Sequence, residues 1–317
     1  MAKIACIGEV MIELAATESS DQAREFKALS YAGDTYNTAV TLARLGTDTT
    51  YVTRLGDDHY SDAIIARLHT EGVGTQAIIR QESTVPGLYM IHNSPDGERE
   101  FFYWRSQAPA RELFTQRQEI SLLEQTLNDC TMVYLSGITL AIISPAARQQ
   151  LLAFLRRFKE RGGQVAFDSN YRPRLWQTPE QAQQATRELL SVTDLALLTL
   201  DDEELLWGDS EDPVAAVQQR YGDYSIAEIV LKRGAQEVII VKGEQRTQVA
   251  VPKVEQIVDT TAAGDTFNAG YLAARSAGES AEAAAAQACR CAAVIIQHRG
   301  GVIDRELYLS ELAKRAQ

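Results

Sequence analysis

The sequence predicts an α/β protein built on a mostly parallel β-sheet with helices on both faces. Short apolar segments alternate with segments of helical periodicity along most of the chain, which is typical of parallel strands joined by crossover helices. The length of 317 residues fits one large α/β unit. A content of 45% hydrophobic and 23% charged residues is ordinary for a soluble globular protein.

The alternation begins at the N-terminus. The segment "KIACIG" is a short apolar run that ends at Gly8 and predicts a buried strand. Helical spacing follows in "TYNTAVTLARLG", which stops at Gly46. The next pair repeats the order, with a strand in "TTYVTRLG" and a helix in "YSDAIIARLHTEG" that ends at Gly72.

A β-hairpin then interrupts the alternation. From Ala77 to Arg105 the apolar period changes to two, and "GLYMIHNSPDGEREFFYWR" contains two strands around the turn signal "NSPDG". We interpret this hairpin as part of a small lid rather than a second domain. We therefore expect one domain over residues 1–317, with a lid formed by about residues 11–33 and 86–110.

Beyond the hairpin, strand and helix alternate again. The predicted pairs are "TMVYLSG" with "SPAARQQLLAFLRRFKERGG", "QVAFDSN" with "TPEQAQQATRELLSV", and "DLALLTL" with "DDEELLWG". The segment "EIVLKRGAQEVIIVKGEQRTQVAVP" predicts consecutive strands with tight turns, and the last third is helical in "AAGDTFNAGYLAARSAG" and "SAEAAAAQACRCAAVIIQH".

The charge balance limits the classes of partner. A net charge of −12 argues against a nucleic acid or an anionic membrane surface, which would require a basic face. An anionic substrate remains compatible, because a local basic pocket can exist in an acidic protein. No apolar run reaches 18 residues, and the N-terminal segment carries Glu9 and Glu13, unlike a signal peptide. We expect a cytoplasmic protein.

The usual metal and nucleotide motifs are absent from the sequence. The cysteines Cys6, Cys130, Cys289 and Cys291 form no CxxC pair and the four histidines are scattered, so we expect buried reduced thiols and no zinc site. No G-x-x-x-x-G-K-[ST] occurs. The segment "EGVGTQ" lacks the third glycine of a dinucleotide fingerprint.

The stretch "DTTAAGDTFNAGYLAARSAG", residues 259–278, combines small residues with a carboxylate at a helix start. Ala262, Ala263 and Gly264 would allow backbone N–H groups to approach an anion, and the helix beginning there adds a positive dipole end. Asp265 could accept the proton of an attacking hydroxyl, as phosphoryl transfer requires. The alternative is that Asp265 is a plain N-cap.

A second candidate site lies upstream in "AGDTYNTAVTLARLG". Gly33 allows close backbone approach, while Asp34 and Asn37 offer acceptors and donors suited to sugar hydroxyls. The alternative is again a capped helix. The two sites together point to a hydroxyl acceptor and a transferred anion.

The hairpin and a later loop offer arginines. Tyr103 and Arg105 lie two apart and share a strand face, next to Tyr89 on the partner strand. Asn170 and Arg172 follow a strand's carboxyl end, where open α/β sheets bind ligands. Two arginines suggest an anionic substrate. The alternatives are a solvated lid charge for Arg105, and a salt bridge or an ATP phosphate contact for Arg172.

Both small-residue stretches resemble signatures of the ribokinase-like, or PfkB, sugar kinase family. The first signature matches Ala32, Gly33, Asn37, Ala39, Gly46 and Gly56. The second matches Asp259, Thr260, Ala262, Ala263, Gly264, Asp265, Ala269 and Gly270. The commonest form of the second signature has Gly where this chain has Ala262, whose methyl group would narrow the approach to the anion.

The resemblance implies a three-layer αβα sandwich with a β lid, and ATP with Mg²⁺ as phosphoryl donor. Asp265 would be the general base, and the backbone amides of residues 262–265 would form the anion hole. The family's N-x-x-E motif, which helps to organise the magnesium ion, falls on Thr199 and Asp202, so both of its defining residues differ in this chain. Two alternatives stay open for Asp202: it would act on Mg²⁺ through water, or it is only an acid at the start of a helix. Residues implied at the nucleotide are Asn170, Lys232, Gly234, Ala235, Ala262 and Gly264. A monovalent cation is a further possibility.

Several segments, among them "GEVMIEL", "FYWR" and "NYRPRLW", resemble the family members that phosphorylate 2-keto-3-deoxygluconate (KDG) at O6. By that resemblance the keto-acid would be held by Gly33, Asp34, Asn37, Tyr89, Tyr103, Arg105, Arg172 and Asp265. Other acceptors (fructose, ribose, 2-ketogluconate or the galacto epimer of KDG) and a non-catalytic sugar or nucleotide sensor stay open. Paired lids in relatives lead us to expect a homo-oligomer.

Overall fold

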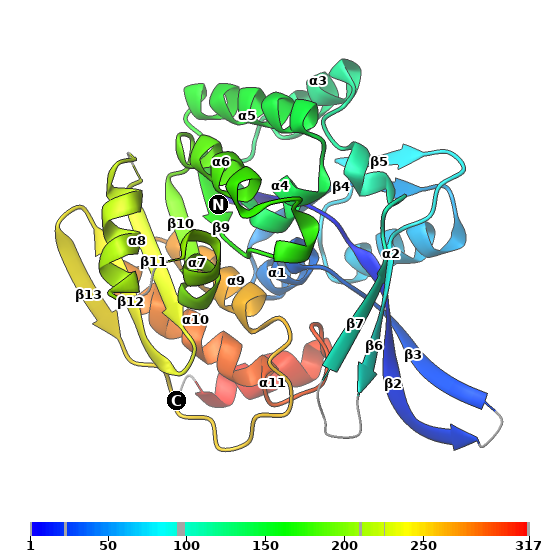
Figure 1. Cartoon of the computed structure of the whole chain (residues 1–317). Helices are drawn as coiled ribbons and strands as arrows, with labels where there is room; N and C mark the ends of the chain where they lie inside the picture. The colour runs from blue at the N-terminus through cyan, green and yellow to red at the C-terminus, as the bar shows by residue number, and fades with distance from the viewer. Residues whose placement is uncertain (1, 22–23, 94–98, 209–210, 225, 316–317) are drawn as a thin grey trace.

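The main body of the molecule is a mixed, mostly parallel sheet (Figure 1). The computed structural model describes residues 2–21, 24–93, 99–208, 211–224 and 226–315. Within those ranges nine strands form one sheet in the order β13-β12-β11-β10-β9-β8-β1-β4-β5. Every neighbouring pair is parallel except β11–β12 and β12–β13, which are antiparallel. The predicted sheet is therefore confirmed.

The central strands of this sheet are short and mostly buried, as is typical of strands covered on both faces, whereas β5 and β13 at its two ends are more polar and more exposed. Their bounds are β1 Lys3–Ile7, β4 Asp48–Gly56, β5 Ile78–Gln81, β8 Met132–Ser136, β9 Gln164–Asp168, β10 Leu195–Thr199, β11 Glu228–Arg233, β12 Gln236–Lys242 and β13 Gln245–Val249.

Helices cover both faces of the sheet and create two hydrophobic cores. Along β1, Ala5 and Ile7 belong to one core, while Ile4 and Cys6 belong to the other. The first core is closed by α3 Arg117–Thr126, α4 Gly137–Ile142, α5 Pro145–Glu160, α6 Pro179–Leu190 and α8 Pro213–Gly222; the second by α1 Asp34–Arg44, α2 His59–Thr70, α9 Ala263–Ser276 and α10 Ala281–Ile295. Three layers result.

The remaining described helices lie at the margins of these layers. Short 3₁₀ turns occur at Pro109–Glu112 and Pro173–Leu175, α7 spans Leu200–Trp207, and α11 spans Arg305–Arg315. The predicted reduced thiols are confirmed, because Cys6, Cys130, Cys289 and Cys291 are all free and buried. In the described part of the chain, no helix has both the length and the apolar character needed to cross a membrane.

A second, smaller sheet projects from the body (Figure 1). Its four described strands are β2 Met11–Asp21, β3 Arg24–Ala32, β6 Leu88–Asn93 and β7 Arg99–Trp104, in the order β3-β2-β6-β7. The pairs β2–β3 and β6–β7 are antiparallel, and β2–β6 is parallel. These strands lie in the two segments expected to form the lid. The turn of the predicted hairpin, residues 94–98, lies outside the described residues.

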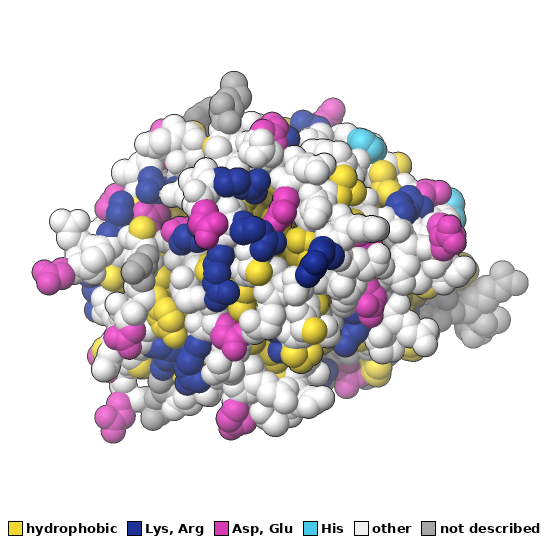
Figure 2. All heavy atoms as spheres, turned by 90° about the horizontal axis from the view of Figure 1, so that it is seen from above, with side chains coloured by type: hydrophobic (Ala, Val, Ile, Leu, Met, Phe, Trp, Pro, Cys, Tyr) yellow, Lys and Arg dark blue, Asp and Glu magenta, His cyan; other side chains and the backbone are white. Residues whose placement is uncertain are grey.

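The acidic net charge is not spread evenly over the surface. Figure 2 shows basic side chains gathered on the face above α5, among scattered acidic groups. Arg156, Arg157 and Arg161 are exposed there, and Arg157 forms an ion pair with Glu124 at 2.5 Å. This face lies over the first core.

Candidate active site

Asp265 occupies the first turn of α9 but is not its N-cap. The N-cap is Ala262, in the left-handed conformation with φ 59° and ψ 15°, and Asp265 is the third residue of the helix. The plain N-cap interpretation is therefore wrong. Asp265 instead accepts a hydrogen bond from Asn37 Nδ2 at 2.8 Å. Its own backbone carbonyl accepts one from Thr38 Oγ1 at 3.1 Å.

The same first turn presents backbone donors. Helix geometry leaves the first N–H groups of α9 without intrahelical partners. The N–H of Ala263 donates to the Thr260 carbonyl at 3.2 Å, so this amide is engaged within the turn. The amides of Gly264 and Asp265 remain as the first-turn donors beside the carboxylate, at the positive end of the helix dipole. Such an arrangement offers backbone donors for an anion directly beside a carboxyl group.

The Asp265 carboxyl is poised to hold a proton near neutral pH. Burial raises the pKa of Asp265 to about 8, and the negative charge of Asp34 adds to the increase. The hydrogen bond from Asn37 acts in the opposite direction, because it stabilises the carboxylate. A carboxylate with such a pKa is a stronger general base than an exposed aspartate.

Asp34 begins α1 and lies beside Asp265. It accepts hydrogen bonds from Ser136 Oγ and from Asn170 Nδ2, the latter at 2.8 Å. Burial raises the pKa of Asp34. Gly33 is the N-cap of α1, and a Cβ there would stand 2.2 Å from the Glu9 carbonyl oxygen, so close backbone packing requires glycine.

The two asparagines predicted for the site each contact one of its two carboxyl groups. Asn170, expected at the nucleotide, contacts Asp34, so the structure groups it with the expected acceptor residues. Asn37, expected on the substrate, donates its amide to Asp265 and thereby restricts the orientation of that carboxyl group. The two asparagines thus fix the orientation of the two carboxyl groups by hydrogen bonds.

Lys232 takes part in a buried polar network next to the start of α9. The residue is 8% exposed, and its ammonium donates to Asn268 Oδ1 at 2.9 Å and pairs with Asp168 Oδ1 at 3.5 Å. Asn268 Nδ2 donates to Asp168 Oδ2 at 2.8 Å. A Cβ on Gly264 would lie 3.7 Å from the Lys232 ammonium, so this charge lies next to the start of α9.

The other residues expected at the nucleotide lie beyond Lys232. Gly234 and Ala235 form the exposed turn between β11 and β12, where Gly234 has a φ of 59°. Asp202, on α7, pairs with Arg172 Nη1 at 3.2 Å. Arg172 is therefore beside the residue expected near the metal; its side chain is half exposed.

The lid carries the predicted aromatic face with an arginine at its end. Tyr89 pairs directly with Tyr103 across β6 and β7, with ring centroids 5.7 Å apart, and Phe101 stacks on Tyr103. The Arg105 guanidinium lies 5.8 Å from the centroid of the Tyr103 ring. The shared face predicted from the two-residue period is confirmed.

Two buried glutamates that the sequence analysis did not assign support these lid residues. Glu9 forms an ion pair with Arg105, and Glu13 accepts hydrogen bonds from the Tyr89 hydroxyl and, at 2.7 Å, from Ser30 Oγ. The signal was available in "GEVMIEL", where two carboxylates interrupt an apolar segment. Buried acids in such a segment require partners.

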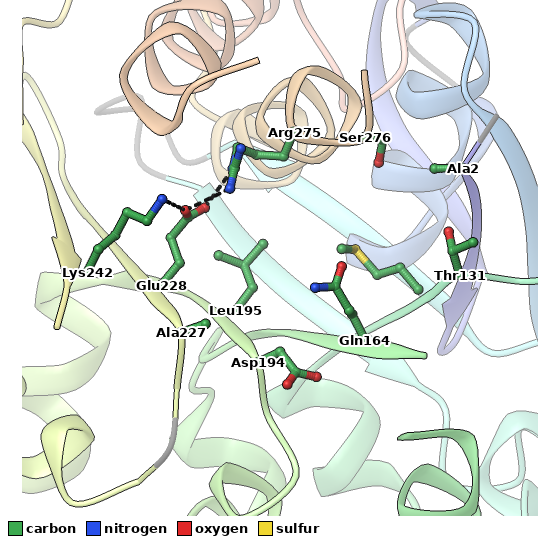
Figure 3. Close-up of a pocket in the computed structure, with 11 residues that line it drawn as sticks. Ala2, Thr131, Gln164, Asp194, Leu195, Ala227, Glu228, Lys242, Arg275 and Ser276 are labelled. Carbon is green, nitrogen blue, oxygen red and sulfur yellow. Dashed lines mark hydrogen bonds and ion pairs between the residues drawn. The ribbon is translucent and has the colours of Figure 1, made fainter. Parts of the chain in front are cut away.

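A separate hollow of about 560 Å³ lies at the opposite edge of the main sheet (Figure 3). Its lining includes Gln164, Leu195 and Glu228, each the first residue of its strand. Glu228 is bound by Arg275 Nε at 2.9 Å and by Lys242 Nζ at 3.3 Å. This hollow is distinct from the Asp265 site, which lies where α1 and α9 begin.

Comparison with known proteins identifies the family. The model of the pfkB family of carbohydrate kinases matches residues 1–306. The chain is 44% identical over 311 residues to the 2-dehydro-3-deoxygluconokinase of Escherichia coli K12, covering 96% of this chain and 98% of that protein. It is also 44% identical over 310 residues to the enzyme of that name from Dickeya dadantii, covering 96% and 97%.

Solved structures agree with this fold at low sequence identity. The 2-dehydro-3-deoxygluconokinase of Thermotoga maritima superposes with a TM-score of 0.84 at 22% identity, covering 98% of both chains. The ATP-bound fructokinase of Xylella fastidiosa gives the same TM-score and identity, covering 99% of both. This chain therefore belongs to the pfkB family of carbohydrate kinases.

Proposed function

We propose that the chain transfers the terminal phosphoryl group of ATP to the O6 hydroxyl of KDG, also called 2-dehydro-3-deoxygluconate, and forms 2-keto-3-deoxy-6-phosphogluconate. The observation that carries the proposal is the position of Asp265, a carboxyl of raised pKa beside first-turn amides of α9. The 44% identity to enzymes named for this substrate supports the choice of acceptor.

The acceptor would lie between the lid and the start of α1. Asp34 and Asn170 are suited to bind its hydroxyl groups, and Gly33 lets the backbone come close. The aromatic face of Tyr89 and Tyr103 would cover the carbon skeleton, while Arg105 would bind the carboxylate. Arg172, half exposed at the edge of the site, is the second cation available to an anionic ligand.

The described residues fit a nucleotide with its magnesium ion. Lys232 is a buried cation beside the first-turn amides of α9, and the Gly234–Ala235 turn is open on one side. No cluster of three or more His, Cys, Asp or Glu that could hold a metal occurs in the described ranges. Asp202 would therefore meet Mg²⁺ through water, while the phosphates supply most ligands, as is common for this ion. Bound there, Mg²⁺ would neutralise phosphate charge.

The residues of this chain would then divide the transfer between them. Asp265 takes the proton of O6 as the oxygen attacks the terminal phosphorus, and the bond from that phosphorus to the ADP oxygen breaks. The amides of Gly264 and Asp265 hold the charge on the transferred group. Asn37 keeps the base oriented, and the lid excludes water that would otherwise accept the phosphoryl group.

We also propose a cytoplasmic homo-oligomer. The outer face of the lid exposes Phe102 by 45% and Trp104 by 58%, and Leu29 is exposed by 47%. Covering these side chains with the lid of a second copy would bury apolar area. The four buried reduced thiols are compatible with a reducing compartment.

An ATP-consumption assay across KDG, its galacto epimer, 2-ketogluconate, fructose and ribose tests the acceptor. We expect KDG to give the highest kcat/KM, with the phosphate on O6 of the product. A higher kcat/KM for fructose or ribose would replace the keto-acid with a neutral sugar. If none of the five compounds supports ATP consumption, the proposal of a kinase for these acceptors is contradicted.

A further inference from the structure

Glu9 is a deeply buried charge at the junction of the body and the lid. It follows the end of β1 and is 2% exposed, and it pairs with Arg105, whose side chain is 10% exposed and lies just after β7. A carboxylate buried to this degree is costly unless it is paired. The Glu9–Arg105 pair therefore links the main sheet to the lid residue that we assign to the substrate carboxylate.

The guanidinium of Arg105 is confined on several sides. Its carbon lies 5.8 Å from the centroid of the Tyr103 ring. A Cβ on Gly87 would stand 3.1 Å from Arg105 Cβ and 3.2 Å from Glu9 Oε1, so the glycine backbone packs against both partners. Such confinement fixes the direction in which the remaining N–H donors point.

The pair leaves hydrogen-bonding capacity unused. Within the described residues, Arg105 Nε is buried and has no hydrogen-bond partner, and the same holds for Glu9 Oε1. Arg105 donates to Glu9 through Nη2, which carries two of the five N–H groups of the guanidinium. A buried donor without a partner on an otherwise fixed arginine calls for an acceptor from outside the protein chain, either an ordered water or a ligand atom.

We propose that Glu9 is a positioning residue for acid recognition: it fixes one edge of the Arg105 guanidinium so that the free donors face the substrate carboxylate. The inference rests on the proposed function, because it takes Arg105 to bind that carboxylate. It differs from a competing role, in which Glu9 would occupy Arg105 until substrate displaced it. Glu9 is the more deeply buried partner, which places it behind Arg105 rather than in the path of the ligand.

The test compares KDG with its neutral C1 amide, which keeps the carbon skeleton and removes the charge. By calorimetry, the affinity of Glu9→Gln for KDG should fall at least ~10-fold, while its affinity for the amide should stay nearly unchanged. The steady-state KM for KDG should rise by a similar factor, with kcat within about 3-fold. Glu9→Asp keeps the charge but shortens its reach, and should also lose part of the discrimination.

Glu13→Gln is the matched control, because it removes another buried carboxylate of the same segment. It should preserve the ratio of KDG affinity to amide affinity. Wild-type or tighter KDG binding by both Glu9 variants would overturn the positioning role. Arg105→Ala distinguishes a failure of the proposed function from a failure of this inference. If Arg105→Ala binds KDG as well as the wild type does, Arg105 does not recognise the acid and the proposed function fails at that point. If KDG binding is weak in Arg105→Ala but not in the Glu9 variants, only the positioning role of Glu9 is contradicted.

Discussion

At the scale of single residues, the site is organised by a pair of carboxyl groups with different partners. Asp265 is bound by Asn37, and Asp34 is bound by Ser136 and Asn170. Burial raises the pKa of Asp265, and the negative charge of Asp34 adds to the increase, so this carboxyl group is partly protonated near neutral pH. The pH dependence of catalysis should report this coupling.

We expect kcat/KM for KDG to increase with pH and to level off above about pH 8, because the base must lose its proton. Asp34→Asn removes the neighbouring negative charge, so the midpoint of this limb should move to lower pH even where the maximal rate falls. The measurement is a pH profile of kcat/KM for both proteins. An unchanged midpoint in Asp34→Asn would mean that the charge of Asp34 does not raise the pKa of the titrating group.

The sequence alone could identify Asp265 but not its surroundings. Small residues before an acid at a helix start are a local pattern, so Asp265 and Gly264 could be predicted. Glu9, Asp168 and Asn268 act through contacts with residues far away in the chain, and a single sequence carries no record of those contacts. The orientation of Asn170 toward Asp34 was inaccessible for the same reason.

At the scale of elements, the start of α9 explains why the signature commonly has glycine at position 262. Ala262 adopts the left-handed conformation, which costs a residue with a Cβ roughly 1 kcal/mol. The position thus concerns backbone conformation as well as the approach of an anion. The methyl group lies against Gly301, whose own Cβ would stand 3.2 Å from it.

Ala262→Gly should relieve this strain but make the unfolded chain more flexible, so the two effects nearly cancel. We expect the free energy of unfolding to change by less than about 1 kcal/mol, and kcat to stay within about 2-fold. Chemical denaturation and steady-state kinetics provide the measurements. A large increase in kcat would show instead that the methyl group obstructs the transferred phosphoryl group.

At the start of α1, Gly33 is required because there is no room for a side chain, and not because of its backbone conformation. Its backbone is extended, but a Cβ would lie 2.2 Å from the Glu9 carbonyl oxygen. Gly33→Ala should therefore lower the free energy of unfolding by about 1–3 kcal/mol. Gly222→Ala is the control: a Cβ there meets nothing within 4 Å, and denaturant unfolding should show little change. Equal stability of Gly33→Ala and wild type would contradict the packing argument.

At the scale of the whole molecule, the alternation of apolar and helical segments was enough to predict the main sheet and its two helical layers. It was not enough for β2 and β3, whose sequence is rich in Ala, Glu and Ser and shows no clear period. Those strands gain their stability from the pairing of β2 with β3 and of β2 with β6. The helix α11 also escaped prediction, since Tyr308 is its one fully buried residue in the described range.

The body and the lid contribute different parts of the proposed reaction. The body supplies the base, the first-turn amides and the buried Lys232, while the lid supplies the aromatic face and Arg105. Glu9 and Glu13 connect the two through buried contacts. Mutations should therefore be able to affect phosphoryl transfer and recognition of the carboxylate separately. A mutation of the proposed base, Asp265, tests the transfer step most directly.

The central claim is that Asp265 removes the proton from O6 of KDG. The most direct measurement is kcat for ATP-dependent phosphorylation of KDG by Asp265→Asn, together with calorimetric binding of KDG. We predict a fall in kcat of at least ~10²-fold with KDG binding retained, because the amide keeps the shape but cannot accept the proton. Turnover close to that of the wild type would contradict the account.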